Sequence, residues 1–550
     1  MTVNEELASF VKEAIHNAVQ KGALPEIALP EVFVERTPRY DHGDYACNVA
    51  LKLKRAMPNS NSMRIAEIIR HYLKPNDSIA TVEIAQPGFI NFRMKQGWLA
   101  GQVLEIIKAG QSYGNVELGK QTKVQVEFVS ANPTGPITIA SARGAALGDA
   151  LANVLEAAGY EVEREFYVND AGSRMEVFYN NCWYYYRKLQ GEVATPPLEN
   201  YPAAEFAARL LIEEYGERFL KLPDSEGRLQ VGVLGIETQL ADIKATLERM
   251  GVKFNRWFRE QSLFDSGEVQ ATLEQLRKKG HVAEREGAVW FGSSALGQEK
   301  DNVLIRSNGL PTYFVSDIAY HYNKFITRGF QKVINIWGAD HQGHIPRLKA
   351  SLNALGLNPD DLTIIVMQMV MVNGARMKKT AGNIITLERV MSEVGADAVR
   401  FNLISRSQDT KIDFDLDLAL AQSNENPVYY VQYAHARCAS IFKQAPEKGI
   451  KTWDDGDITL LNNDADLNLV RQLTLLPEIV AGAARNLEPH RLAFYAQDLA
   501  SAFHTYYHDN RVIDPENVPL SKARLLLVSA VKITLARALS LMGMSAPEEL

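Results

Sequence analysis

The clearest structural signal in the chain is Val124-Gln-Val-Glu-Phe-Val-Ser-Ala-Asn-Pro-Thr-Gly-Pro-Ile-Thr-Ile-Ala-Ser141. Apolar and polar residues alternate over 124–129, which is typical of a strand with one buried face. The Gly- and Pro-containing residues 132–136 end that pattern, and apolar residues then recur over 147–158 at the spacing of a helix. A second alternating run over 161–168 completes a β-α-β unit, which predicts a parallel sheet.

Two later segments indicate further strands of the same sheet. They are Val333–Trp337 and Thr363–Val372, and each is followed by a loop rich in polar residues. We therefore predict an α/β fold built on a Rossmann-like parallel sheet. In such open sheets the ligand binds outside the carboxyl ends of the strands, which is where these loops fall.

Changes of pattern divide the chain into three predicted domains. Residues 1–110 mix helical and alternating patterns, which favours a small α+β domain. Residues 111–426 carry the sheet pattern, interrupted at about 181–261 by an aromatic and then helical insertion. In 427–550 strand signals vanish and helical periodicity dominates, so an all-α domain is expected there.

The composition is that of an ordinary globular protein, with 46% hydrophobic and 23% charged residues in a chain of 550. Its three cysteines lie far apart and form no CxxC pair, which argues against a disulfide framework and a structural zinc site. Acidic residues stand near the N-terminus, where a secretory signal would be basic, and the most apolar stretch, 362–372, is too short to cross a membrane. We expect a cytoplasmic protein without a membrane segment. The net charge of −7 leaves nucleic-acid binding open, because a basic strip can lie within an acidic chain.

Two loops have the chemistry to hold phosphate groups. Residues 130–141 connect a strand to a helix, whose free N–H groups and positive dipole end favour an anion, although a plain connection between strand and helix would look the same. In Gly374-Ala-Arg-Met-Lys-Lys-Thr-Ala-Gly382, two glycines bracket three cations that could stabilise charge on a polyphosphate. The alternative for this second loop is an ordinary solvated turn.

A third group of residues suits a cationic ligand. Tyr313 and Asp317 share one face of a helix predicted over 313–326, and Glu127 ends the first strand of the sheet. Two carboxylates and a phenol can bind a guanidinium fork, but both acids could instead be ion-paired to Arg143 or Arg347. His341 and His344 are more consistent with structural histidines than with metal ligands, so no metal site is predicted.

Taken in order, these motifs resemble the arginyl-tRNA synthetase family of class I aminoacyl-tRNA synthetases over essentially the whole chain. Residues 41–46 and 88–92 are similar to the family's N-terminal additional domain, and 126–136 with 142–149 to its first catalytic motif. The amino-acid pocket region of the family is similar to 311–321 and 337–340. Residues 428–437 resemble the entry to its anticodon-binding helices, and 543–548 its usual C-terminus.

The resemblance implies a Rossmann-like catalytic domain with insertions, a small α+β tRNA-contacting N-terminal domain and an all-α C-terminal anticodon-binding domain. It implies an arginine–tRNA ligase that uses ATP, accompanied by Mg2+, to form arginyl-adenylate and transfers arginine to the 3′-terminal adenosine of tRNA(Arg), releasing AMP and diphosphate. We expect a monomer.

The same resemblance implies residue roles. Thr138, Ser141, Arg376, Lys378 and Lys379 would be catalytic. The arginine pocket would consist of Glu127, Asn132, Tyr313, Asp317, His341 and Gln342. ATP would be bound by Pro133, Thr134, Gly135, Thr138, Ala140, Ser141, Arg143, Gly144, Gly338, Asp340, Met377 and Lys379. For tRNA, Tyr429, Tyr433 and Arg437 are the candidates, within a wider set of tyrosines that could stack on bases: Tyr429, Tyr430, Tyr433, Tyr495, Tyr506 and Tyr507.

The chain departs from the family pattern in two places. The HIGH signature falls on Thr138-Ile-Ala-Ser141, so that both histidines are replaced by hydroxyl residues. The KMSKS signature falls on Arg376-Met-Lys-Lys-Thr380, where Lys378 replaces a serine. We hypothesise that the additional cation Lys378, with Arg143, offsets the missing histidines.

Three other functions remain open at this point. Loss of the histidines would also fit an inactive relative that only binds RNA. A different class I synthetase or a nucleotidyltransferase would share the fold, although the paired acids favour a cationic substrate. A dinucleotide-dependent oxidoreductase ranks lowest, because no GxGxxG motif follows the first strand.

Overall fold

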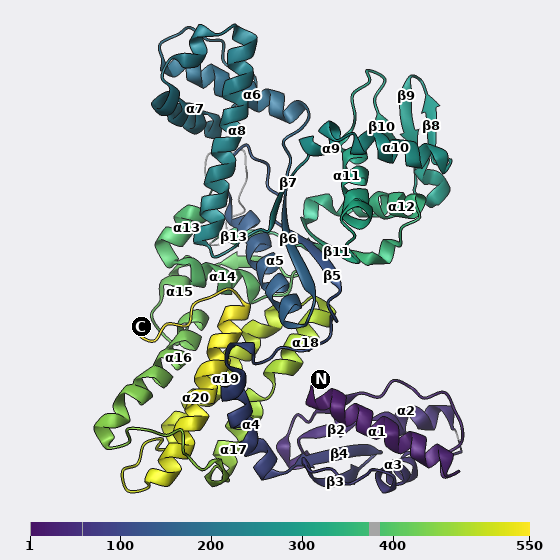
Figure 1. Cartoon of the computed structure of the whole chain (residues 1–550), viewed down its shortest axis with the longest axis vertical. Helices are drawn as coiled ribbons and strands as arrows, with labels where there is room; N and C mark the ends of the chain where they lie inside the picture. Colours follow the sequence, from purple (N-terminus) through teal and green to yellow (C-terminus); the bar gives the residue numbers. More distant parts are fainter. Residues whose placement is uncertain (1, 58, 373–384) are drawn as a thin grey trace.

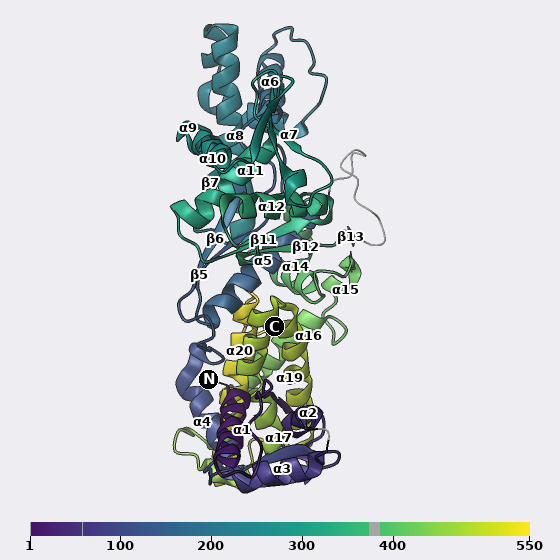
Figure 2. The same cartoon turned by 90° about the vertical axis from the view of Figure 1, so that its right-hand side faces the viewer.

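The computed structural model describes residues 2–57, 59–372 and 385–550. The molecule is elongated: the N-terminal elements and the C-terminal helices lie side by side at one end, the central sheet lies above them, and two groups of elements project from the other end (Figure 1, Figure 2). Among the described residues, no helix is both long and apolar enough to cross a membrane.

The central sheet confirms the predicted α/β class. Its five strands run in the order β12-β11-β5-β6-β7, and every neighbouring pair is parallel. Three of them coincide closely with the predicted strands. The bounds are β5 Lys123–Glu127, β6 Glu161–Val168, β7 Arg256–Arg259, β11 Lys332–Gly338 and β12 Leu362–Met367.

The two faces of this sheet differ in polarity. On one face Val124, Val126 and Phe166 pack with helix α5 (Ile139–Ala157) in the main apolar core. On the other face Gln125, Glu127, Glu165 on β6 and Asn335 on β11 are buried but polar, and this face is covered by α11 (Tyr313–Tyr322) and α12 (Ile345–Leu355). The alternation over 124–129 therefore separates an apolar face from a buried polar one.

Two predicted elements differ from the structure. The single strand expected over 363–372 is two strands. The Gln368 N–H donates to the Gln408 carbonyl (3.0 Å), so the chain leaves the central sheet at this residue. The second part, β13 (Val370–Val372), pairs instead with β14 (Ile412–Phe414). The helix expected over 313–326 ends as α-helix at Tyr322 and continues as a π-helical turn, Asn323–Thr327.

Both projecting groups arise between strands of the sheet. Three helices lie between β6 and β7, and β7 itself falls inside the range 181–261 while pairing in the central sheet. Two helices and an antiparallel sheet of order β10-β9-β8 lie between β7 and α11. The bounds are α6 Ser173–Leu189, α7 Pro202–Tyr215, α8 Asp224–Arg249, α9 Gln261–Asp265, α10 Glu268–Lys278, β8 Val282–Arg285, β9 Ala288–Phe291 and β10 Asn302–Ile305.

The N-terminal elements form an antiparallel sheet, β1-β2-β4-β3, with helices. Among the described residues they contact the C-terminal helices through three ion pairs, Asp44–Arg471 (2.6 Å), Arg36–Glu478 (3.1 Å) and Glu5–Arg485. The bounds are α1 Val3–Gln20, β1 Val34–Arg36, β2 Tyr45–Cys47, α2 Val49–Ala56, α3 Ser62–His71, β3 Ile79–Ala85, β4 Phe89–Met94 and α4 Gln96–Ala109. After the sheet follow α13 Leu387–Val394, α14 Ala396–Ile404, α15 Leu416–Leu420, α16 Pro427–Gln444, α17 Asp464–Leu473, α18 Leu476–Asn486, α19 His490–Asp509 and α20 Val518–Leu541.

Candidate active site

The chain turns sharply where β5 ends. Val129 and Ser130 both have positive φ angles, 67° and 39°, which is costly for a β-branched residue such as valine. The Ser130 hydroxyl holds this turn, because it donates to Glu127 Oε1 (3.0 Å) and accepts from the Tyr167 N–H (3.2 Å). The turn directs residues 131–138 over the carboxyl edge of the sheet, where we expected the ligand.

Glu127 is not ion-paired to Arg143 or Arg347, the two partners considered from the sequence. Its Oε2 atom accepts a hydrogen bond from the Lys324 ammonium (2.6 Å), and both side chains are buried. Lys324 was not among the candidates, because its proximity to β5 depends on the π-helical turn that follows α11. The carboxylate of Glu127 is therefore already neutralised within the protein.

Asp317 lies one helical turn after Tyr313 on α11. Among the described residues, no side chain makes an ion pair or hydrogen bond with its carboxylate. Burial raises the pKa of Asp317 to about 7; the nearby acids Glu260 and Glu127 add to the rise, while Arg347 and Lys324 oppose it. A cationic ligand next to Asp317 would therefore stabilise the ionised form of its carboxylate.

A cavity of about 520 Å³ opens beside Tyr313. Glu260, between β7 and α9, lines it with a side chain that is only 3% exposed. Its Oε1 atom accepts from the Ser316 hydroxyl (2.7 Å), and its Oε2 atom has no hydrogen-bond partner among the described residues. Burial raises the pKa of Glu260. Sequence reasoning missed this residue, because no local pattern places a residue of the 181–261 range beside α11.

The remaining residues predicted for the arginine pocket lie on loops at the same edge of the sheet. Asn132 is half-buried in the loop after β5. His341 and Gln342 are exposed on a 3-10 helix, Ala339–His344, directly after β11. Gly338 ends β11, and the exposed Asp340 lies 3.6 Å from His341. The described structure thus places Tyr313 and Glu260 on one cavity and Asp317 one helical turn after Tyr313, with the other candidates on the neighbouring loops.

The predicted phosphate loop ends in a regular helix cap. The Thr138 hydroxyl accepts from the Ser141 N–H (3.3 Å), and the Ser141 hydroxyl lies 3.4 Å from it. Ile139 N–H donates to the Ile385 carbonyl (3.3 Å), and Leu387 N–H to the Ile137 carbonyl (2.8 Å). Of the other ATP candidates, Thr134 and Gly135 are half-buried, Pro133 and Gly144 are buried, and Ala140 is exposed.

We expected Arg143 to contact phosphate, but in the structure its guanidinium binds two main-chain carbonyls. Arg143 is 1% exposed, and its guanidinium donates to the carbonyls of Gln368 (2.7 Å) and Ser407 (2.8 Å). Burial lowers the pKa of Arg143 to about 10, opposed by Asp409. In this structure Arg143 braces α5 against the segments that flank β13 and β14, and it is not available to offset the missing histidines.

Four candidates, Arg376, Met377, Lys378 and Lys379, lie outside the described residues. β13 ends at Val372, and residues 385–387 pair with 137–139 at the start of α5. The described chain therefore lies against the start of α5 where it resumes at residue 385.

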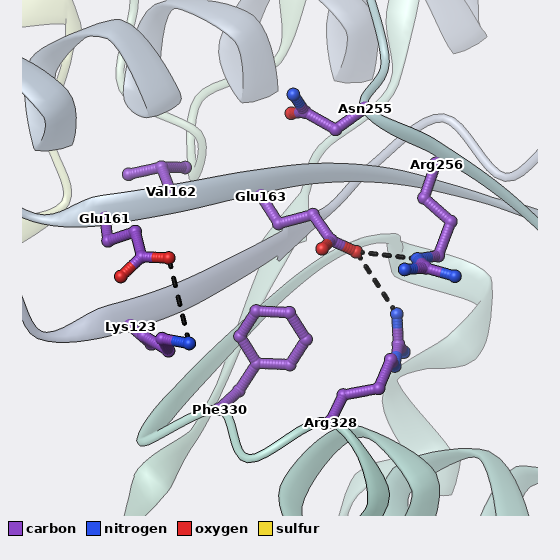
Figure 3. A pocket seen from close by; sticks show the side chains of 8 residues that line it. All are labelled: Lys123, Glu161, Val162, Glu163, Asn255, Arg256, Arg328 and Phe330. Atoms are coloured by element: carbon purple, nitrogen blue, oxygen red, sulfur yellow. Dashed lines mark hydrogen bonds and ion pairs between the residues drawn. The ribbon is translucent and has the colours of Figure 1, made fainter.

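A separate cavity, shown in Figure 3, lies at the opposite end of the sheet strands. Its charged side chains are paired with one another: Glu163 accepts from Arg256 (2.9 Å) and from Arg328 (3.3 Å), and Lys123 lies 3.8 Å from Glu161. These contacts tie β5, β6 and β7 together at their amino ends, away from the loops described above.

Known proteins match the chain over its full length. Residues 5–94 match the arginyl tRNA synthetase N terminal domain, 102–423 the catalytic domain of class I (R) tRNA synthetases, and 431–550 the DALR anticodon binding domain. The chain belongs to the arginyl-tRNA synthetase family. Among curated arginine–tRNA ligases, that of Dehalococcoides mccartyi is 45% identical over 100% of this chain and 99% of its own length. The Bacillus subtilis ligase is 43% identical over the whole of both chains.

Solved arginyl-tRNA synthetases share the fold. The Thermus thermophilus structure superposes with a TM-score of 0.79 at 22% identity, and that from Plasmodium falciparum with 0.77 at 17% identity. Each comparison covers all of both chains. The fold of the arginyl-tRNA synthetase family is therefore conserved here from the N-terminal sheet to the last helix.

The candidate tRNA-binding residues of this arginyl-tRNA synthetase family member form one half-buried cluster on α16 and α19. Tyr429 and Tyr433 stack with ring centroids 6.0 Å apart, and the Arg437 guanidinium donates to the Tyr433 hydroxyl (2.9 Å). Arg437 also lies over the Tyr507 ring, and Tyr430 and Tyr433 both contact His504. By contrast, Tyr495 and Tyr506 are core residues with bonded hydroxyls, so they cannot stack on bases in this fold.

Proposed function

We propose that the chain is an active arginine–tRNA ligase, which forms arginyl-adenylate from L-arginine and ATP and transfers arginine to the terminal adenosine of tRNA(Arg). The observation that carries this proposal is the pair of neighbouring, under-compensated carboxylates Asp317 and Glu260, of which Glu260 lines the cavity beside Tyr313. A guanidinium presents a planar fork of donors that two carboxylates can accept together, whereas a lysine ammonium would leave acceptors unpaired. Each buried acceptor left unpaired costs about 1 to 3 kcal/mol.

In the proposed reaction the arginine carboxylate attacks the α-phosphorus of ATP, pyrophosphate leaves, and a ribose hydroxyl of tRNA then attacks the adenylate carbonyl. No protein nucleophile is needed, so the protein orients the reactants and stabilises charge. Asn132, His341 and Gln342 would hold the main-chain end of arginine. The N-terminal turn of α5 and the loop with Arg376, Lys378 and Lys379 would bind the ATP phosphates, with Thr138 and Ser141 as hydrogen-bond donors.

Mg2+ would enter with ATP, bound chiefly by phosphate oxygens and water. Within the described residues, no group of three or more His, Cys, Asp or Glu side chains is placed to hold a metal ion, so no protein ligand is assigned. When bound, Mg2+ would neutralise charge on the departing pyrophosphate. We further propose that the chain acts in the cytoplasm and is a monomer; light scattering of the purified protein would test the monomeric state.

Aminoacylation with a panel of substrates tests the proposed substrate. Arginine, lysine, citrulline and ornithine would each be offered with total tRNA. We expect charging with arginine at the lowest concentration and at least 100-fold poorer charging with citrulline, which has the shape of arginine but no positive charge. Equal charging with lysine would contradict the proposed pocket.

The raised pKa of Asp317 predicts a pH dependence of arginine use. Arginine binds the ionised carboxylate, so below about pH 7 the guanidinium has to displace a proton. We expect kcat/KM for arginine to fall up to about tenfold for each pH unit below that value, with little change above it. In the free protein, the folded state holds the Asp317 proton more tightly than the unfolded state does. The free energy of unfolding should therefore fall as pH rises from about 4 toward 7. Arginine should therefore raise the melting temperature more at pH 8 than at pH 6, and an equal rise at both would contradict this assignment.

The half-buried aromatic cluster on α16 and α19 predicts that Tyr433 binds tRNA. Tyr433→Ala removes a ring that stacks on Tyr429 and His504, and we expect the KM for tRNA(Arg) to rise by about tenfold or more, because one base stacked on an aromatic ring is worth about 1 to 3 kcal/mol. The KM for arginine should stay the same. Tyr506→Phe is the matched control: it removes the hydrogen bond to Asp466 from a core tyrosine and should lower the melting temperature without changing the KM for tRNA.

An RNA-binding protein without catalytic activity is the second candidate. It is favoured by one observation, the Thr138-Ile-Ala-Ser141 sequence in place of both HIGH histidines. In the structure the Thr138 hydroxyl caps α5, which is a structural role that needs no catalysis.

A further inference from the structure

Two largely buried ion pairs join the N-terminal sheet to the C-terminal helices. They are Asp44–Arg471 and Arg36–Glu478, and we call them the interface pairs. Asp44 is 1% exposed, although it belongs to the segment 41–46 that resembles the family's N-terminal domain. Asp41 and His42 of the same segment are exposed. One half of this segment therefore faces the rest of the protein, and the other half faces solvent.

Both oxygens of the Asp44 carboxylate are used inside the protein. Oδ1 accepts from the Arg471 guanidinium (2.6 Å) near the end of α17, and Oδ2 accepts from the Met94 N–H (2.7 Å) at the end of β4. The Arg471 guanidinium also lies over the Tyr40 ring, 4.9 Å from its centre. Asp44 thus ties the N-terminal sheet to α17.

Arg36, on β1, caps the carboxyl end of α17. Its guanidinium donates to the main-chain carbonyls of Arg471 (3.4 Å) and Thr474 (3.1 Å), where a helix has free acceptors and the negative end of its dipole. It also donates to Glu478 Oε1 (3.1 Å), which accepts from the Tyr45 hydroxyl as well (3.0 Å). The corner between α17 and α18 is therefore bound by side chains of the N-terminal sheet.

An interface built on buried charges fixes orientation more than it adds affinity. Two ions gain little net energy when they are buried together, because both lose their hydration, but their contact is lost if either partner shifts. Hydrogen bonds from a guanidinium are also directional, since its donors form a planar fork. The interface pairs therefore hold the N-terminal sheet in one position against the C-terminal helices.

The N-terminal part also carries a cationic surface. Residues 49–95 contain eight Lys or Arg and only three Asp or Glu, although the net charge of the chain is −7. Four of these cations are exposed on α2 and α3, which suits the anionic backbone of a nucleic acid: Lys54, Arg55, Arg64 and Arg70. The C-terminal helices, which lie beside this part (Figure 1, Figure 2), carry the aromatic cluster on α16 and α19.

A ligand long enough to reach both surfaces gains from a fixed relation between them. Once it is bound at one surface, the other acts at a high effective concentration, but only if the geometry allows both contacts at once. A loosely attached N-terminal sheet would occupy the matching position for only part of the time. The orientation set by the interface pairs thus bears directly on affinity for such a ligand.

We propose that the interface pairs are positioning pairs for tRNA binding: they hold the cationic surface of α2 and α3 where a tRNA bound at the aromatic cluster also contacts it. This inference rests on the proposed function, which supplies tRNA(Arg) as the ligand. It gives Asp44 and Tyr45 of the N-terminal segment a role inside the protein and not at the RNA.

The test compares binding of whole tRNA(Arg) with binding of its isolated anticodon stem-loop, which we expect to contact the aromatic cluster alone. A four-site variant of the full chain removes every charge of the interface pairs, so that no buried charge is left unpaired: Arg36→Met/Asp44→Asn/Arg471→Met/Glu478→Gln. We expect the Kd for whole tRNA, and its KM in aminoacylation, to rise about tenfold or more. The Kd for the stem-loop, kcat and the KM for arginine should each change by less than about twofold.

A milder variant keeps the test decisive if the four-site variant does not fold. Asp44→Asn/Arg471→Met removes one interface pair and should raise the Kd for whole tRNA by about threefold. Glu5→Gln is the control, because Glu5 pairs with Arg485 at the same interface while both side chains remain partly exposed, and such pairs contribute little. The control should change the Kd for whole tRNA by less than about twofold.

Two results would overturn the inference. If binding of whole tRNA and of the stem-loop weakens by the same factor, the interface pairs support the aromatic cluster itself. If the melting temperature falls while both Kd values stay the same, the interface pairs only stabilise the fold.

Failure of the proposed function would look different. An unaltered chain that binds tRNA(Arg) but does not charge it would overturn the proposed function alone, and the Kd values of the variants would still decide the role of the interface pairs. An unaltered chain that binds no tRNA(Arg) would overturn both proposals.

Discussion

Asp317→Asn should abolish most arginine charging while ATP binding is retained. The substitution preserves shape and removes the charge that would meet the guanidinium, and losing one partner of a buried charge pair costs about 2 to 5 kcal/mol. That corresponds to a fall in kcat/KM for arginine of about 30- to 4000-fold. Steady-state aminoacylation with varied arginine measures the fall, and ATP binding can be followed separately by calorimetry.

Glu274→Gln is a suitable control for Asp317→Asn. Glu274 is exposed on α10, the helix that packs against α11, so its substitution changes the net charge of the same region without entering the cavity. It should alter kcat/KM for arginine by less than about twofold. Charging by Asp317→Asn at the rate of the unaltered chain would show that the pocket has been assigned to the wrong residues.

Glu260→Gln should have the second largest effect, and it tests a residue that only the structure revealed. The buried Oε2 atom of Glu260 has no partner among the described residues, so a guanidinium that reaches it gains an ion pair. We expect kcat/KM for arginine to fall by about 10- to 100-fold. Because the amide still offers an oxygen, charging with citrulline should fall much less, and the preference for arginine over citrulline should shrink.

A smaller preference for arginine over citrulline in Glu260→Gln would show that Glu260 recognises the guanidinium, because damage to the fold would lower charging with both substrates. Ser316→Ala removes the hydrogen bond to Glu260 Oε1 but leaves the carboxylate charge, so it should reduce arginine use less than Glu260→Gln does. If Glu260→Gln lowers arginine and citrulline charging by the same factor, the residue supports the cavity wall and does not bind the guanidinium.

Local sequence patterns predicted the centre of the fold well. The strand over 161–168 and the helix ending before Gly159 match the structure because alternation, helical spacing and a glycine with positive φ act within a few residues of one another. The run 363–372 failed as one strand, because apolar residues suit two short strands as well as one long strand, and a contact to distant Gln408 separates them.

The candidate site was predictable only in part. Tyr313 and Asp317 are four residues apart on a helix, so their common face follows from the sequence. Glu260 and Lys324 enter the site through packing between segments that are far apart in the chain, and a π-helical turn has no reliable sequence signal. Arg143 was misjudged for the opposite reason, since a basic residue near a phosphate loop is a natural candidate until its burial is known.

The most direct test of the proposed function is arginine-dependent formation of AMP from ATP by the purified, folded chain in the presence of tRNA(Arg), compared with Lys379→Ala. The chain should turn over despite the Thr138-Ile-Ala-Ser141 sequence, with arginine and tRNA both required, and Lys379→Ala should lose at least about 100-fold in kcat because it removes a cation predicted to stabilise the transition state. No AMP formation by the well-folded chain, with tRNA still bound, would contradict catalysis and leave an RNA-binding protein.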